Sequence, residues 1–276
     1  MRNIGLHGRL TSTLSALIDR AISQKSTILQ CFFITQEAME YVTFAPGELE
    51  SCRKKIQTNF KQAYLHASYW VNLAGMRRNG WKTFKREVEL AIALGFTHVV
   101  IHPGSATGCE TREQGLEYLA RALNRALEKY HDITIVIENT AHGNMSIGGN
   151  LKDFKALLAL ITEPHRLAFC IDTAHAYVYG YDITTAQGLE DFVEEIERTI
   201  GLNKVILLHL NDSEKPLGSK IDKHETPGKG LIGLDALRRC FEHPRFAHTS
   251  VIVEAPMLAD EKELELLAMM RSWSNQ

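Results

Sequence analysis

The stretch Val205–Gly233, VILLHLNDSEKPLGSKIDKHETPGKGLIG, contains the signals from which both the fold and a site can be predicted. It opens with an apolar run of strand type that ends at His209, and a long polar segment without periodicity follows. Loops of this kind are uncommon in compact domains unless they serve a function. In an extended segment Asp222 and His224 would point the same way. A carboxylate and an imidazole at this spacing suit a divalent metal such as zinc, although solvated polar loops also contain such pairs.

The same kind of apolar run recurs along the chain and alternates with longer amphipathic segments, as in repeated βα units with a parallel sheet. Strands are predicted at Asn3–His7, Ile28–Phe33, Ala63–His66, Thr97–His102, Ile133–Glu138, Leu167–Asp172, Val205–His209 and Ser250–Glu254. Helices are predicted at Thr13–Gln24, Gly47–Lys61, Thr83–Leu94, Arg112–Tyr130, Leu151–Ile161, Gly188–Ile200, Leu234–Phe241 and Asp260–Arg271. The pattern predicts an α/β fold, a (β/α)8 TIM barrel. No linker or low-complexity tract divides the chain, so residues 1–276 are expected to form one domain.

The composition is that of an ordinary globular protein, with 45% hydrophobic and 23% charged residues and a net charge of −2. No apolar run approaches the roughly 18 residues of a membrane span, and a strand directly after the first residues leaves no room for a signal peptide. We therefore expect a cytoplasmic protein without a membrane partner. The 5 cysteines are scattered, which favours free thiols. The net charge provides no general basic field, so phosphate binding would require local cations or metal ions.

Ionisable residues gather at the predicted carboxyl ends of the strands. They are His7, His66, His102, Glu138, Asp172, His209 and Glu254. In a parallel barrel these ends meet on one face, where barrel enzymes place their chemistry. We assign no ligand role to His7, but His175 follows in the loop after Asp172, and Asp222 and His224 follow His209. The resulting nine candidates exceed the three or four ligands of one zinc ion, which favours two or three divalent ions and a phosphodiester substrate.

The ordered set of motifs resembles the endonuclease IV family of apurinic/apyrimidinic endonucleases. The matching segments are His66-Ala-Ser-Tyr69, Ile101-His102-Pro-Gly-Ser105, Val136-Ile-Glu138-Asn-Thr140, Cys170-Ile-Asp172-Thr-Ala-His175, His209-Leu-Asn-Asp212, Ser219-Lys-Ile-Asp222-Lys-His224 and Gly228-Lys-Gly230. The resemblance implies a xylose-isomerase-like TIM barrel and a zinc-dependent DNA repair enzyme. The enzyme would cleave 5′ to abasic sites and leave a 3′-hydroxyl. Its partner would be double-stranded DNA with abasic or 3′-blocked lesions, bound by a monomer in the cytoplasm at the nucleoid.

The resemblance also distributes the ligands over three zinc ions, with manganese as an alternative at one position. The first ion would be held by His66, His102 and the bridging Glu138. The second would be completed by Asp172, His209 and Glu254. The third would be held by His175, Asp222 and His224. Glu138 and Glu254 are the catalytic candidates.

Candidate substrate contacts lie in loops expected on the same face. They are Tyr69, Arg77, Arg78, Ser105, Lys223 and Lys229. Tyr69 matches an aromatic residue that the family places at the lesion, whereas the cations equally suit solvated loops. One departure concerns the loop after the second strand, where the family reads Asn-x-Arg-x-Trp and inserts its Arg into DNA. This chain reads Ile34-Thr-Gln-Glu37-Ala-Met39, and the carboxylate of Glu37 would repel phosphate.

Three alternatives remain open. A sugar isomerase or epimerase-like barrel would use two Glu, an Asp and a His around one or two ions, but it has no evident need for His175, Asp222 and His224. A relative that cleaves another nucleic acid or phosphodiester would accommodate Glu37. A non-catalytic binding protein is disfavoured because all nine ligand positions are intact.

Overall fold

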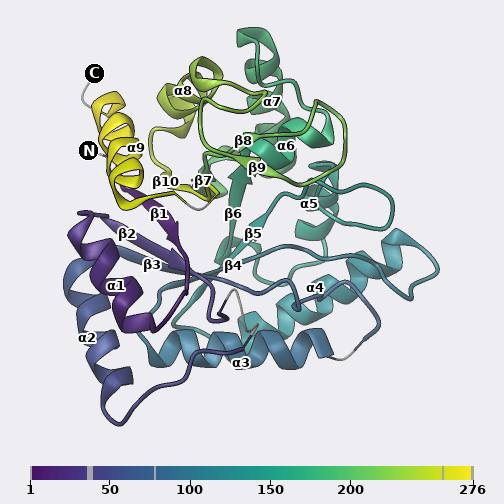
Figure 1. Cartoon of the computed structure of the whole chain (residues 1–276). Helices are drawn as coiled ribbons and strands as arrows, with labels where there is room; N and C mark the ends of the chain where they lie inside the picture. Colours follow the sequence, from purple (N-terminus) through teal and green to yellow (C-terminus); the bar gives the residue numbers. More distant parts are fainter. Residues whose placement is uncertain (1, 36–39, 78, 257, 275–276) are drawn as a thin grey trace.

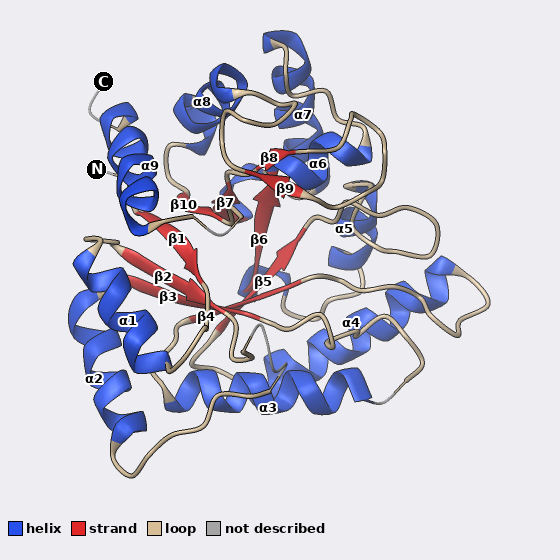
Figure 2. Cartoon of the chain, viewed as in Figure 1, coloured by secondary structure: helices blue, strands red, loops and turns tan. Residues whose placement is uncertain are grey.

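The computed structural model describes residues 2–35, 40–77, 79–256 and 258–274. Eight of its strands close into a parallel barrel in the order β1-β10-β7-β6-β5-β4-β3-β2. Their bounds are β1 Ile4–Gly8, β2 Ile28–Cys31, β3 Gln62–His66, β4 His98–Ile101, β5 Thr134–Glu138, β6 Leu167–Asp172, β7 Val205–His209 and β10 Ser250–Val253. The predicted (β/α)8 barrel is confirmed, and the helices surround the strands (Figures 1 and 2).

Eight helices follow the predicted pattern. They are α1 Leu14–Ser23, α2 Glu48–Asn59, α3 Asn79–Ala93, α4 Arg112–Lys129, α5 Lys152–Leu158, α7 Ala186–Thr199, α8 Leu234–Glu242 and α9 Asp260–Trp273. The largest errors are at α3, which begins at Asn79 rather than Thr83, and at α5, which ends at Leu158 rather than Ile161. In the described part of the chain, no helix has both the length and the apolarity needed to cross a membrane.

Three short elements, a helix after β6 and a pair of two-residue strands after β7, were not predicted. The segment after β6 is a short helix, α6 Thr173–Tyr179, and not a loop. It begins there because the Asp172 side chain accepts a hydrogen bond from the His175 N–H at 2.8 Å, as an N-cap. The long polar segment after β7 is not wholly irregular, because β8 Asp212–Ser213 pairs antiparallel with β9 His224–Glu225. Local side-chain bonds, which periodicity does not report, decided both differences.

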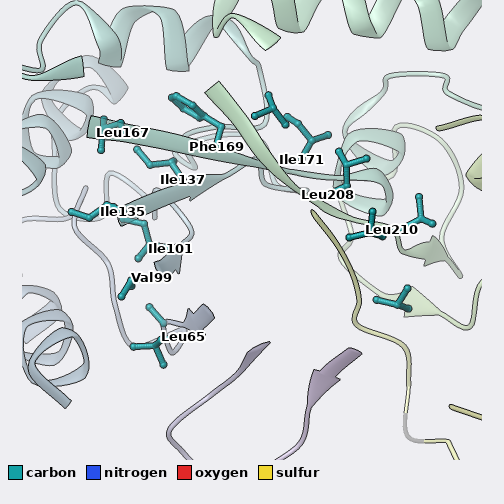
Figure 3. Packing of buried hydrophobic residues seen from close by; sticks show 14 of the residues in the cluster. Leu65, Val99, Ile101, Ile135, Ile137, Leu167, Phe169, Ile171, Leu208 and Leu210 are labelled. Carbon is teal, nitrogen blue, oxygen red and sulfur yellow. The ribbon is translucent and has the colours of Figure 1, made fainter. Parts of the chain in front are cut away.

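The alternation of side chains along the strands creates two apolar layers. Outward residues such as Leu65, Ile137 and Phe169 pack between the barrel and its helices, as Figure 3 shows for part of this layer. Inward residues form a separate interior cluster, which comprises Ile28, Tyr64, Val100, Val136, Ala168, Cys170, Leu207 and Ile252. Burying each large apolar side chain contributes roughly 1.5–3 kcal/mol. The barrel is therefore a packed core, and its polar chemistry is confined to its ends.

Candidate metal centre

The inward-facing side chains at the carboxyl ends of six strands place six predicted ligands at one end of the barrel. Side chains two residues apart on a strand point the same way, so the residue two positions after an interior one also faces inward. The interior and mouth residues pair as Tyr64 with His66, Val100 with His102, Val136 with Glu138, Cys170 with Asp172, Leu207 with His209 and Ile252 with Glu254. Six of the nine predicted ligands are therefore positioned by barrel geometry alone.

Glu138 lies at the centre of this group and is fully buried. Its Oε2 lies 3.1 Å from His66 Nε2 and 3.5 Å from His102 Nε2. Its Oε1 lies 3.0 Å from His209 Nδ1 and 3.3 Å from His175 Nδ1. The two oxygens thus face different sets of imidazoles, as a carboxylate between two ions would.

His209 forms a second group with three carboxylates. Besides the contact with Glu138, its Nδ1 lies 3.3 Å from Glu254 Oε2 and 3.9 Å from Asp172 Oδ2. The strand register brings these residues together, because Asp172 pairs with His209 and Ile252 pairs with His209 on the other side. Three acceptor oxygens converging on one ring nitrogen form a set that a cation would satisfy.

The third group lies toward the opening and comes from the loop segments. Asp222 Oδ2 lies 3.1 Å from His175 Nε2, and Asp222 Oδ1 lies 3.3 Å from His224 Nε2. His224 Nε2 also lies 3.6 Å from Asp172 Oδ2, which connects this group to the second one. The expectation that Asp222 and His224 converge is confirmed.

A buried carboxylate, Asp212, holds the loop that carries the third group. Its oxygens accept hydrogen bonds at 2.9–3.4 Å from five backbone N–H groups, those of Ser213, Gly228, Gly230, Ile232 and Gly233. A Cβ on Gly230 would lie 2.5 Å from Asp212 Oδ1, so only glycine fits at that position. The return of the chain at Gly228 and Gly230 therefore fixes the ribbon on which His224 lies.

The second nitrogen of four imidazoles faces a carbonyl oxygen. His66 Nδ1 lies 3.0 Å from Ala67 O, His175 Nδ1 lies 2.9 Å from Asn139 O, and His224 Nδ1 lies 3.4 Å from Glu254 O. His209 Nε2 lies 3.0 Å from the side-chain oxygen of Gln30. A carbonyl can only accept, so with metal ions bound each ring would carry its proton on that nitrogen and offer the other to an ion, namely Nε2 in His66, His175 and His224 and Nδ1 in His209. This is the arrangement of metal-ligating histidines.

Protonation behaviour follows from this crowding. Burial alone would raise the pKa of Glu138, but His209 and His102 lower that pKa well below its usual value. The pKa of Glu254 is lowered well below its usual value for the same reason, burial being outweighed by His209 and His7. Burial alone would lower the pKa of His175, but Asp172 and Asp222 raise it well above its usual value. Glu138 and Glu254 therefore hold their charge beside imidazoles that can take up protons, whereas burial raises the pKa of Asp172.

Bound divalent ions fit this donor set. Across the described ranges, no Lys or Arg makes an ion pair with Glu138, Asp172, Asp222 or Glu254, and their ion-pair partners are imidazoles. His224 Nε2 is buried and has no hydrogen-bond partner among the described residues, although it is aimed at two carboxylates. Buried charge without a balancing partner is costly. Two ligand-like groups meet the distance requirements of a metal site, namely His66, Glu138, His209 and Glu254, and Asp172, His175 and His224.

A cavity of about 530 Å³ opens above these residues. Six of the nine predicted ligands line it, and they are His66, His102, His175, Asp222, His224 and Glu254. Glu138, Asp172 and His209 lie beneath them and are fully buried. A substrate in the cavity can therefore contact the six lining ligands, while Glu138, Asp172 and His209 stay shielded from bulk water.

The predicted substrate contacts are divided by the structure. Tyr69, which is 66% exposed, and Ser105 line the cavity. Arg77 lines a neighbouring hollow that shares Asn72 with the cavity. Lys223 pairs with Glu214 at 2.6 Å, and neither Lys223 nor Lys229 is among the lining residues. Arg78 and Glu37 lie outside the described residues.

Two residues of this region were missed by sequence reasoning. Gln30 is the inward residue two positions after Ile28, so the period of the second strand could have identified it. Arg9 follows His7 by two residues and is the one Lys or Arg among the described side chains that line the cavity. Its guanidinium donates to Ala255 O at 2.5 Å. Charge at a strand end marks neither residue, because Gln30 is an uncharged amide and Arg9 lies just beyond the end of β1.

Comparison with known proteins agrees with this geometry. A family model described as xylose isomerase-like TIM barrel matches residues 30–273. The probable endonuclease 4 of Chloroflexus aurantiacus is 32% identical over 280 residues, covering 99% of this chain and 98% of that protein. The probable endonuclease 4 of Thermotoga neapolitana is 36% identical over 207 residues, covering 74% and 72%.

A solved structure supports the same assignment over the whole length. Endonuclease IV from Thermus thermophilus superposes with a TM-score of 0.84 at 29% identity, covering 100% of this chain and 99% of that one. The resemblance recognised in the sequence is confirmed by the family model, the relatives and this structure. The chain therefore belongs to the endonuclease IV family of xylose isomerase-like TIM barrels and is a hydrolase of phosphodiester bonds.

Proposed function

We propose that this enzyme is a zinc-dependent endonuclease that cleaves double-stranded DNA on the 5′ side of an abasic site and leaves a 3′-hydroxyl. The observation that carries the proposal is the arrangement of nine predicted ligands in three groups around Glu138, at the base of one cavity. The names of the relatives support endonuclease chemistry on DNA. One chain supplies all nine ligands, which supports a monomer as the working unit. A DNA substrate would place that monomer in the cytoplasm at the nucleoid.

Three zinc ions are proposed for the three groups. His66 and His102 would hold the first together with Glu138. His209, Asp172 and Glu254 would complete the second, and His175, Asp222 and His224 would hold the third. Ions so placed would activate water and stabilise the attacking and leaving oxygens at phosphorus. Imidazole and carboxylate ligands suit zinc, and manganese remains an alternative at one position.

The side chains themselves orient and shield the reaction. Asn211 donates to Asp172 Oδ2 at 2.5 Å, and its Oδ1 accepts from the backbone N–H of Glu254 at 2.8 Å, which fixes the Asp172 carboxylate and the backbone of Glu254. Glu138 and Glu254 are the proposed catalytic carboxylates; Glu138 is fully buried at the base of the cavity, and Glu254 lines the cavity. Tyr69 and Ser105 would contact the nucleotide at the lesion. Arg9 would contact a phosphate, because it alone adds a fixed positive charge to the described lining.

The principal rival is a sugar isomerase or epimerase activity, which related barrels perform around one or two ions. The group formed by His175, Asp222 and His224 argues against it. A sugar isomerase has no evident use for a third ion at the outer edge of the centre. Phosphodiester cleavage does have one, because the leaving oxygen must be stabilised while the attacking oxygen is activated.

The test is cleavage of a labelled duplex that contains one abasic site, with an intact duplex and the corresponding single strand as controls. We expect a metal-dependent nick 5′ to the abasic site, a 3′-hydroxyl product and no cleavage of the intact duplex. Turnover of another phosphodiester without this nick would contradict the substrate assignment but leave the chemistry in place. Loss of both would contradict the proposal as a whole.

A further inference from the structure

We propose that Gln30 is a positioning residue that fixes the tautomer of His209 and the orientation of Glu254 through one amide group. Gln30 is fully buried on β2, and both partners come from distant strands of the barrel. Gln30 Oε1 lies 3.0 Å from His209 Nε2, and Gln30 Nε2 lies 2.8 Å from Glu254 Oε1. The inference rests on the proposed metal site and adds a residue outside its nine ligands.

The carboxylate of Glu254 determines which way the amide faces. A carboxylate can only accept hydrogen bonds, so the NH2 group of Gln30 must face Glu254 Oε1. The amide oxygen then faces His209 Nε2, and because a carbonyl oxygen can only accept, that nitrogen must carry the proton. The opposite orientation would place two acceptor oxygens against each other in a buried region, which is costly.

With the second ion bound, the proton on Nε2 would leave His209 Nδ1 as the nitrogen that donates its lone pair. This atom faces Glu138 Oε1 at 3.0 Å and Glu254 Oε2 at 3.3 Å, as required of a ligand to the second ion. Without the Gln30 acceptor, the alternative tautomer would place its proton on Nδ1, where two carboxylates would attract it. That proton would compete directly with a metal ion for the same lone pair.

His209 differs from the other oriented imidazoles in the source of its acceptor. His66, His175 and His224 each turn their second nitrogen toward a backbone carbonyl, which no substitution can remove. His209 depends on a side chain. The orientation of this one ligand is therefore encoded by a single replaceable residue, which makes the inference testable by mutation.

The test compares Gln30→Met with Gln62→Met. Gln30 lies on β2 and Gln62 on β3. Gln62 is at the amino end of the barrel, away from the proposed metal centre, and its Oε1 accepts from Ser250 Oγ at 2.7 Å. Zinc affinity is measured by competition with a chelator, and kcat and KM are measured on the abasic duplex. We expect Gln30→Met to lower the affinity for one of the zinc ions by about 10–100-fold and to lower kcat with KM unchanged. Gln62→Met should retain native zinc affinity and kcat.

A spectroscopic readout separates positioning from general damage. In zinc-loaded protein with 15N-labelled histidine, His209 should show a slowly exchanging Nε2–H resonance, assigned by its absence in His209→Gln. Gln30→Met should lose this resonance while those of the other buried imidazoles remain. If the variant does not fold, Gln30→Leu provides the test, because a similarly sized apolar side chain also removes the acceptor and should lose the same resonance.

The outcomes are distinguishable. Native protein that binds no zinc would contradict the proposed function itself. Native protein that binds three zinc ions, beside a Gln30→Met variant with equal affinity, equal kcat and an unchanged His209 resonance, would overturn the role of Gln30 alone. For Gln30→Leu, a His209 resonance that persists unchanged would overturn it in the same way.

Discussion

The two ends of the barrel are built on the same strands but use their polar side chains in opposite ways. At the amino end, Thr27 Oγ1 accepts from the Ile4 N–H at 2.9 Å and donates to Ile4 O at 3.2 Å. Thr97 makes the same double contact with Ala63, at 3.3 and 3.2 Å. At the carboxyl end, Glu138 alone faces four imidazoles. Polar groups at the first end are satisfied pair by pair, whereas those at the second share partners.

The arginines show the same contrast. Arg2, at the amino end, donates to Thr249 O at 2.8 Å and Phe246 O at 2.7 Å, and its guanidinium packs over Phe241. Arg9, at the carboxyl end, makes one hydrogen bond within the described part of the chain, to Ala255 O, and lines the cavity. A side chain whose hydrogen bonds are all used within the protein stabilises it, while one with remaining donors is available to a ligand. By this criterion Arg2 is a structural residue, and Arg9 is available to a ligand.

The largest effect is expected for Glu138→Gln, which removes the shared carboxylate. An amide presents only one acceptor oxygen to the imidazoles that Glu138 now faces through both. We expect kcat on an abasic duplex to fall by at least about 10³-fold, comparable to the loss of a principal electrostatic group. The matched control is Glu190→Gln, which removes a Glu–His pair with His243 outside the cavity. Activity within tenfold of native for Glu138→Gln would contradict a bridging role.

Metal removal is the next largest change. Four carboxylates lose their counter-charge when the ions leave, so a chelator should abolish cleavage and lower thermal stability. An ion whose free concentration is about 1,000 times its dissociation constant adds roughly 4 kcal/mol to the free energy of unfolding. We expect calorimetry to show a lower Tm for the chelated protein, and zinc to restore both Tm and cleavage. An unchanged Tm, or full recovery with magnesium alone, would oppose the zinc assignment.

A pH effect is expected at the amino end, where His98 stacks on Tyr64 with ring centroids 4.5 Å apart. Burial lowers the pKa of His98 to about 4, below its ordinary value of 6.5. Protonation is therefore easier in the unfolded chain, so this contribution to stability is complete above pH 6.5 and is lost as the pH falls toward 4. Between pH 7 and pH 4, the free energy of unfolding should fall by roughly 3 kcal/mol less in His98→Asn than in the native protein.

Denaturant titration of both proteins at the two pH values measures this difference. The ligands of the proposed metal centre are the same in both proteins, so their titration cancels in the comparison. A native protein and a variant whose free energies of unfolding fall in parallel would show that His98 is not the group responsible.

The smallest effect is expected for Arg9→Gln. If Arg9 contacts a phosphate, KM on the abasic duplex should rise about 5-fold, and the slope of log(kcat/KM) against log salt should become shallower by about one. Arg2→Gln is the matched change at the other end and should lower stability without altering the salt slope. Identical salt slopes for native protein and Arg9→Gln would exclude a phosphate contact by this residue.

Much of the fold was predictable because the alternation of side chains along a strand also decides which residues face the barrel interior. The predicted bounds of β6 and β7 are those of the structure, and their last residues, Asp172 and His209, are neighbours in the register. Helix α6 was missed because a seven-residue helix is specified by its Asp172 cap rather than by a long apolar stripe. Single caps carry little signal in a sequence.

The site was predictable to the extent that charge marks it. His66, His102 and Glu138 are conspicuous at strand ends, and the structure brings them together. Gln30 carries no charge, and its importance depends on the positions of His209 and Glu254, which come from strands far away in the sequence. Residues that orient ligands are defined by three-dimensional contacts, so sequence patterns identify ligands more readily than their supports.

The central claim is that the carboxyl end of the barrel is a three-metal centre. The most direct test is elemental analysis of the purified, dialysed protein, combined with anomalous X-ray scattering above and below the zinc absorption edge. We predict three zinc ions per chain, one beside His66 and His102, one beside His209, and one beside His175 and His224. A single ion per chain, or an ion elsewhere in the molecule, would contradict the account.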